Sequence, residues 1–163
     1  MSFPTVRQSG NITPGHLVQW ITDGVVADGN ISSSLIFTVF DAFEFVIDGT
    51  GLAVTSGFKG VLQAPYYGTI SQATLLADQT GTIVVNVYKC TQLQYDGGVT
   101  HPTVGDKITS STPPTITGST KSQDNTLSGW TTIFNAGDIF GFNVDSTSGV
   151  IQRVLISLRV TRS

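Results

Sequence analysis

The side chains that could do chemistry are few: eleven carboxylates, two histidines and one cysteine. Two carboxylates placed together could hydrolyse a glycosidic bond. Glu44, the only glutamate, lies three residues from Asp41, so in an extended strand the two side chains point to opposite faces. The other aspartates of interest stand next to glycine, or within a few residues of it, where an aspartate caps a turn. These turn aspartates are Asp23, Asp28, Asp48, Asp78, Asp96 and Asp138.

The remaining candidates for catalysis or metal binding are equally isolated. His16 follows Pro14-Gly15 and His101 precedes Pro102, and no serine nucleophile motif accompanies either. The turns "DGG" and "DGTG" are too short and too poor in oxygen ligands for a calcium loop. A lone cysteine, Cys90, excludes both an intrachain disulfide and a cysteine-based zinc cage. We therefore expect no catalytic residue, no metal and no cofactor, and a protein that is not an enzyme.

Aromatic side chains leave one functional alternative open, a platform on which sugar rings could stack. Ordinary packing in the core and at its rim is the competing interpretation. The candidate glycan-binding aromatics are Tyr66, Tyr67, Tyr88, Tyr95 and Trp130.

The charge pattern excludes several classes of partner. Only 12% of the residues are charged, the net charge is −3 and the isoelectric point is near 5.0, so no basic footprint for nucleic acid exists. No apolar run approaches the length of a membrane span, so we expect no membrane insertion. The first residues, "MSFPTVRQSG", contain no signal-peptide pattern, which predicts assembly in the cytoplasm.

The elements that must position these residues are strands. Apolar patterning predicts strands at about 43–48, 57–63, 69–77, 82–89, 129–134, 139–145 and 150–161, with a hairpin turn at 78–81. Residues 34–40 are either a further strand or a short amphipathic piece, and 91–129 form a long polar connection, with or without short edge strands. In the last strand Val154, Ile156, Leu158 and Val160 share one face. The pattern predicts an all-β protein, an antiparallel β-sandwich of jelly-roll type over 34–163.

The leader, residues 1–33, has a different character. Residues 9–30 combine Pro14, four glycines and two Asp-Gly pairs with dense apolar side chains. Turn residues at this density favour irregular backbone, and apolar residues at this density favour contact with another surface. We expect an extended N-terminal assembly arm that becomes ordered against a neighbouring subunit, or alternatively a segment that covers an open edge of its own sheet. The expected interface residues are Leu17, Val18, Trp20, Ile21, Val25 and Val26.

Several motifs resemble a β-sandwich module found in structural proteins of tailed bacteriophages, over about residues 57–161. They are Leu76-Ala77-Asp78-Gln79, Lys121-Ser122-Gln123-Asp124, Gly129-Trp130-Thr131, and Ala136-Gly137-Asp138 followed by Phe142-Asn143-Val144-Asp145. The leader separately resembles a segment near the N-terminus of phage tail and virion proteins. The resemblance implies a jelly roll that assembles into a virion and has no catalysis.

These observations together predict a non-enzymatic virion structural protein, a surface-exposed tail-fibre or tail-accessory component that assembles through its N-terminal arm. Its expected partners are other phage virion proteins and copies of itself in a homo-oligomer, with a host surface glycan as a further candidate. One alternative is a capsid decoration, or cement, protein that stabilises the phage head. A second alternative is a carbohydrate-binding module for receptor recognition.

Overall fold

The chain divides into two compact units, residues 1–39 and 40–163, in the computed structural model. The structure describes residues 7–11, 13–14, 16–22, 25–32 and 39–162. The predicted boundary at 33/34 and most of the 34–40 segment lie outside these residues. Apart from one turn of 3-10 helix, all regular structure in the described ranges is β-strand. The chain is therefore all-β, as the alternating apolar pattern predicts.

The N-terminal unit contains a small sheet with strand order β1-β3-β2. Its strands are β1 (Arg7–Ser9), β2 (His16–Thr22) and β3 (Val25–Ser32). β2 and β3 are antiparallel, whereas β1 is parallel to β3. The expectation of irregular backbone thus differs from the structure. β2 ends at Thr22 and β3 begins at Val25, so most of the leader's apolar residues belong to two paired strands.

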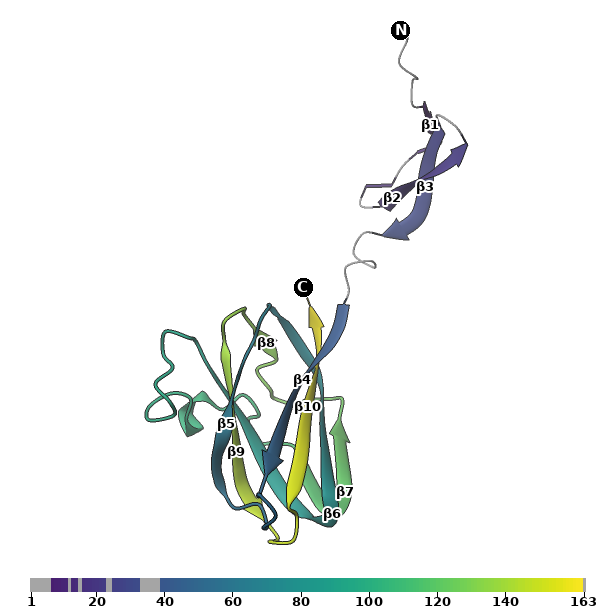
Figure 1. Cartoon of the computed structure of the whole chain (residues 1–163). Helices are drawn as coiled ribbons and strands as arrows, with labels where there is room; N and C mark the ends of the chain where they lie inside the picture. Colours follow the sequence, from purple (N-terminus) through teal and green to yellow (C-terminus); the bar gives the residue numbers. More distant parts are fainter. Residues whose placement is uncertain (1–6, 12, 15, 23–24, 33–38, 163) are drawn as a thin grey trace. The chain divides into compact units, whose positions relative to one another are not determined.

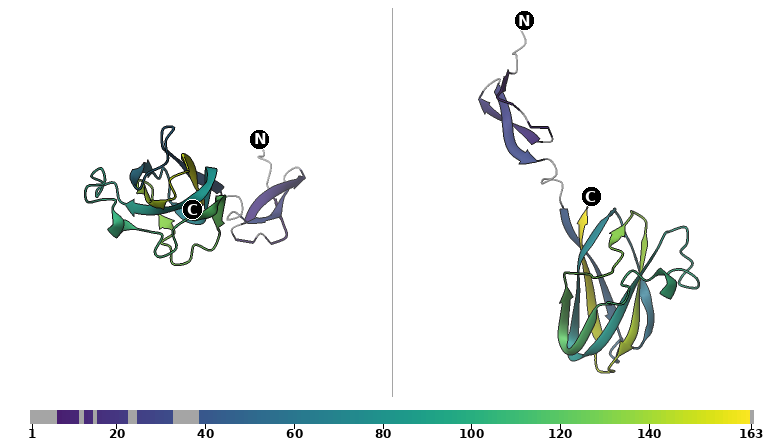
Figure 2. Two further views of the ribbon diagram at one scale, coloured as in Figure 1. Left: turned by 90° about the horizontal axis from the view of Figure 1, so that it is seen from below. Right: turned by 180° about the vertical axis from the view of Figure 1, so that it is seen from behind.

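The C-terminal unit is a curled antiparallel sheet with order β4-β10-β6-β9-β5, in which β7 and β8 also pair with β6 (Figure 1). The strands are β4 (Val39–Asp48), β5 (Gly57–Gln63), β6 (Gly68–Cys90), β7 (Thr115–Asp124), β8 (Ile133–Phe134), β9 (Ile139–Thr147) and β10 (Arg153–Arg162). Seen from behind, the same strands again curl around a common interior (Figure 2).

β6 organises this sheet because it is a single strand of 23 residues. β10 pairs with its first part, from Gly68 to Ala77, and β9 pairs with its last part, from Ile83 to Cys90. β7 lies along its other side and pairs with both parts. The predicted hairpin turn at 78–81 is therefore wrong.

The turn-type residues at 78–81 bend the strand without reversing it. Leu76 pairs with Lys121 and Gly81 with Ser119, so the six positions from 76 to 81 on β6 lie opposite only three positions of β7. Such a bulge bends a strand and increases its twist. Asp78 holds the bend by accepting the backbone N–H groups of Gln152 and Arg153, both at 3.1 Å, just where the chain passes from β9 to β10.

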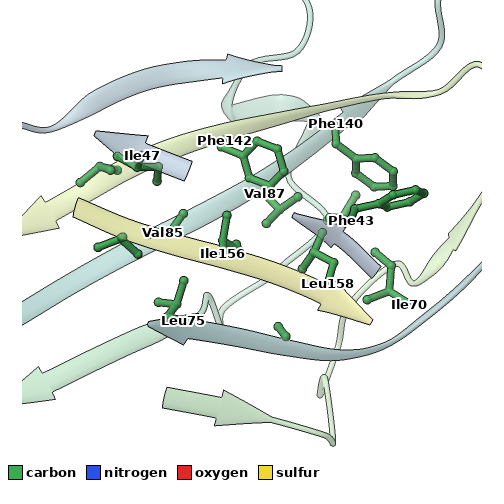
Figure 3. Close-up of a cluster of buried hydrophobic side chains, with 14 of the residues drawn as sticks. Phe43, Ile47, Ile70, Leu75, Val85, Val87, Phe140, Phe142, Ile156 and Leu158 are labelled. Atoms are coloured by element: carbon green, nitrogen blue, oxygen red, sulfur yellow. The ribbon is translucent and has the colours of Figure 1, made fainter. Parts of the chain in front are cut away.

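The core fills the interior of the curled sheet. Val154, Ile156, Leu158 and Val160 of β10 are all fully buried, which confirms the predicted face of that strand. Phe43 of β4 packs against Phe134 and Phe140, with ring centroids 5.2 and 5.5 Å apart. Figure 3 shows side chains of β4, β6, β9 and β10 meeting in one cluster. Its labelled members are Phe43, Ile47, Ile70, Leu75, Val85, Val87, Phe140, Phe142, Ile156 and Leu158.

The polar connection after β6 contains one turn of 3-10 helix, η1 (Val104–Asp106), and then packs beside β6. The Ile108 N–H donates to the Val87 carbonyl at 3.0 Å, and the Thr109 hydroxyl donates to the Asn86 side chain. This contact explains why Asn86 and Tyr88, on the face of β6 opposite Val85 and Val87, are also buried.

Candidate functional site

The turn aspartates that the structure describes cap backbone groups. Asp48 accepts the Thr50 N–H at 2.7 Å, and Asp138 accepts the Asn135 N–H at 2.9 Å. Asp96 accepts three successive N–H groups, those of Val99, Thr100 and His101, each at 3.0 Å. The turn interpretation is thus confirmed for Asp48, Asp96 and Asp138. Asp78 lies within β6 and instead caps backbone N–H groups of the connection between β9 and β10. Asp28 lies in β3, and Asp23 lies outside the described residues.

These hydrogen bonds favour the ionised carboxylates. The pKa of Asp96 lies far below its usual range, first because of the Thr100 hydroxyl and then because of the backbone N–H groups. The pKa of Asp78 is lowered chiefly by the Arg153 N–H. Lowered pKa values suit structural acceptors, whereas a general acid needs a raised pKa.

Asp41 and Glu44 do not form a carboxylate pair of the kind used in glycoside hydrolysis. Asp41 interacts with the Tyr66 hydroxyl, and burial together with this bond raises the pKa of Tyr66 to about 12. The Ala42 N–H and the Tyr66 hydroxyl lower the pKa of Asp41. Glu44 is exposed on β4.

His101 and Cys90 have structural surroundings. His101 Nδ1 lies 3.0 Å from Asp106 Oδ2 within the connection after β6, while His16 lies in β2. Cys90 is buried at the end of β6, and burial raises the pKa of its thiol. In the described part of the chain, no three histidine, cysteine or acidic side chains gather in a way that could hold a metal ion.

The five candidate aromatics divide between core and surface. Tyr88 and Trp130 are buried, and the Trp130 indole N–H donates to the Thr112 carbonyl at 3.0 Å. Tyr66 packs at the rim of the core with the Arg162 guanidinium 3.8 Å from its ring centroid. Only Tyr67 and Tyr95 are substantially exposed. Tyr88 and Trp130 thus fit the packing interpretation, while stacking by the other three stays a prediction.

The expected arm residues lie on the paired strands of the N-terminal unit. Leu17, Val18, Trp20 and Ile21 belong to β2, and Val25 and Val26 belong to β3, where Trp20 lies opposite Val26. Their role in assembly stays a prediction.

A polar groove on the outer face of the C-terminal unit was not predicted from the sequence. Its volume is about 390 Å³. It crosses four strands or their ends and is lined by Phe40, Ser71, Gln72, Gln123, Asn125 and Arg159. We call this the transverse groove.

Strand register explains how the lining residues come together. Arg159 of β10 lies directly opposite Gln72 of β6. One step further along β6, Ala73 lies opposite Asp124, so Asn125 follows directly at the end of β7. Thr74, two residues after Gln72 on β6, points to the same face as Gln72. It lies between Ser157 of β10 and Gln123 of β7. Residues directly opposite on neighbouring strands share a face, so these rows form one surface.

A bulge shapes the groove. The β6–β10 register shifts between Arg159 and Val160, which leaves Ser71 as an extra residue on β6. The Ser71 hydroxyl donates to the Arg159 carbonyl at 3.3 Å and ties the two strands together at this point. The Arg159 guanidinium lies over the Phe40 ring, 4.9 Å from its centroid.

Three amide side chains and one guanidinium of the groove have no polar partner within the described residues. In the described ranges, the side-chain amides of Gln72, Gln123 and Asn125 have no hydrogen-bond partner, and the Arg159 guanidinium pairs with no carboxylate. No acidic residue lines the groove. The alternation of polar and apolar residues in the sequence identifies which residues of a single strand point outward. It does not predict the register that brings residues of four strands to one surface.

Exposed apolar side chains gather on the loop after β6. Leu93, Val99 and Val104 are 97%, 80% and 71% exposed, while Asp96 and its three backbone bonds order the loop beneath them.

No protein-family model matches the chain, and no curated protein matches it either. The described residues include no helix long and apolar enough to span a membrane.

Proposed function

We propose that this protein is a non-enzymatic structural component of a tailed-phage virion, displayed on the surface as a tail-fibre or tail-accessory protein. The observation that carries the proposal is the division into a small β unit rich in apolar residues and a larger unit with its own closed core. In such an arrangement the small unit can attach to the particle while the larger unit is displayed on its surface. The resemblance of residues 57–161 to phage β-sandwich modules supports the choice of particle.

In this proposal the curled sheet is a β-sandwich of jelly-roll type. One layer consists of β4, β10, the first part of β6 and β7, and the other consists of β5, β9 and the last part of β6. The bend at 78–81, which lets one strand serve both layers, supports this assignment.

The N-terminal unit is the proposed assembly arm. Leu17, Val18, Trp20, Ile21, Val25 and Val26 supply apolar surface for another virion protein or a second copy of the chain. Tryptophan is enriched among residues that anchor interfaces. Symmetric assembly repeats one such contact at every subunit.

Mass spectrometry of gradient-purified particles tests the proposal. We expect the chain to co-purify with infectious particles in several copies per particle. Its absence from particles, with abundant protein in the infected cell, would overturn the virion assignment.

Two alternatives have observations in their favour. The ordered loop with exposed Leu93, Val99 and Val104 would suit a cement protein that grips a capsid surface. The transverse groove favours a carbohydrate-binding function.

A further inference from the structure

We propose that the transverse groove binds a short acidic saccharide, with Arg159 recognising a carboxylate on one sugar and the amides of Gln72, Gln123 and Asn125 recognising hydroxyl groups. The inference goes beyond the proposed structural role and rests on the groove, not on a position in a virion.

The dimensions of the groove suit an extended ligand. It reaches from Phe40 on β4, across β10 and β6, to Gln123 and Asn125 at the end of β7. Neighbouring strands lie about 4.8 Å apart, so four strands span roughly 14 Å. A second cavity of about 370 Å³, lined by Thr74, Leu76, Lys121, Ser122 and Gln123, shares Gln123 with it. The two cavities form a band that could hold several linked sugar rings.

The chemistry of the lining matches sugar hydroxyls. Each amide side chain offers both donors and acceptors, as a hydroxyl group does. Phe40 is 60% exposed at one end of the groove and offers an apolar surface to the C–H groups of a sugar ring.

Charge selects an acidic saccharide over a neutral one. Arg159 in the groove and Lys121 in the adjoining cavity are cations, and no carboxylate lines either cavity. A guanidinium binds a carboxylate with two parallel hydrogen bonds, which makes it a specific partner as well as a charged one. Its position over the Phe40 ring holds the guanidinium at the groove wall.

Other polymers fit less well. The groove crosses the face of paired strands, whereas a peptide that added a strand would pair along the edge of β4 or β7 and would not lie across that face. Nucleic acid needs several cations along its phosphates, whereas this chain has a net charge of −3 and the two cavities together have two cations.

The test is an array of acidic saccharides, each printed beside its neutral counterpart: galacturonate and glucuronate oligomers with their methyl esters, and sialylated oligosaccharides with their asialo forms. Full-length protein is applied, and affinities for the members it binds are measured by calorimetry. We expect at least one acidic member to bind and its neutral counterpart to bind at least about tenfold more weakly, since a hydrogen bond to a charged group contributes about that factor.

Two variants locate the site. Arg159→Gln should weaken binding about tenfold and remove the preference for the acidic member, and Gln123→Ala should weaken binding of both forms. Lys59→Gln, on β5 outside the groove, makes the same change in net charge and should leave binding unchanged. Residues 123 and 159 are exposed, and equal melting temperatures would show that the variants fold.

Binding of no acidic saccharide above its neutral counterpart would overturn the inference, as would binding that Arg159→Gln does not weaken. A negative array with the chain present on purified particles would leave the structural role standing. If the chain binds saccharide but is absent from purified particles, the groove proposal stands and the structural role in a virion is contradicted.

Discussion

Asn86 is a buried polar side chain that links three segments of the C-terminal unit. It is 1% exposed, accepts the hydroxyl of the fully buried Thr109 and donates to Asp145. Asp145 in turn accepts from Asn143 at 2.7 Å. These bonds join β6, β9 and the connection after β6 through one amide.

Replacing Asn86 by alanine should destabilise the fold. Thr109 would be left as a buried hydroxyl without its partner, and an unsatisfied buried group costs about 1–3 kcal/mol. Urea unfolding followed by tryptophan fluorescence measures the change in unfolding free energy. The double variant Asn86→Ala/Thr109→Val leaves no buried donor without a partner. Its loss of unfolding free energy should therefore be smaller than the sum of the losses in the two single variants. If the losses add strictly, the two side chains do not interact.

Asp96 makes the loop after β6 sensitive to acid. Its folded-state pKa is lowered, so its stabilisation is fully present above its unfolded-state pKa of about 3.9 and is lost as the pH falls toward the lower folded value. We expect the side-chain carboxyl resonance of Asp96 to stay unchanged from pH 7 to about pH 4 and to move only below it. The amide resonances of Val99 and Thr100 should change over the same low-pH range, and this low-pH change should be absent from Asp96→Asn. A midpoint at or above pH 4 in the native protein would contradict the assigned hydrogen bonds.

At the element scale, the bend in β6 depends on Gly81. A Cβ atom at this position would lie 2.8 Å from Ile151 Cγ1 and 2.9 Å from Ser148 Oγ, and Ile151 is fully buried. The lack of a side chain thus lets the connection between β9 and β10 pack onto the bend.

Gly81→Ala should therefore lower the unfolding free energy by about 1–3 kcal/mol, the usual range for overpacking. Gly105→Ala is the matched control, because no atom outside its neighbours lies closer than 3.9 Å to the added Cβ, and it should change stability little. Thermal and urea unfolding of both variants make the comparison. Equal stability of the two variants would mean that Gly81 is not a point of close contact.

The elements that were predictable from sequence are those set by local pattern. The range 57–63 coincides with β5, and the alternation of Val154, Ile156, Leu158 and Val160 identifies the buried face of β10. The continuity of β6 was not predictable, because Asp78 and Gly81 are turn residues locally and the strand β7, which pairs with β6 on both sides of the bend, lies some forty positions later in the sequence.

The transverse groove escaped prediction for the same reason. Phe40, Gln72, Gln123 and Arg159 are unremarkable polar or apolar positions on four separate strands. Only the strand order and the extra residue at Ser71 bring them to one surface.

In the whole molecule, we expect the N-terminal unit to be needed for assembly into particles but not for folding of the C-terminal unit. Among the described residues, the members of the hydrophobic core cluster all lie between positions 43 and 160. We expect a chain lacking residues 1–30 to keep its melting temperature, to sediment as a smaller species than the full chain and to be absent from particles.

Trp20→Ala should reduce incorporation into particles without changing the melting temperature.

The opposite result has a clear meaning. If the truncated chain assembles as well as the full chain but melts much lower, the segment covers an edge of its own sheet. The proposed arm would then be wrong, whatever the location of the protein.

Immunogold labelling of purified particles tests the central claim most directly. Antibodies raised against the full chain should label intact particles, and we predict gold at the tail or its fibres. Gold confined to the head would favour the cement alternative over a tail position. Labelling of infected cells with none on purified particles would contradict every virion assignment.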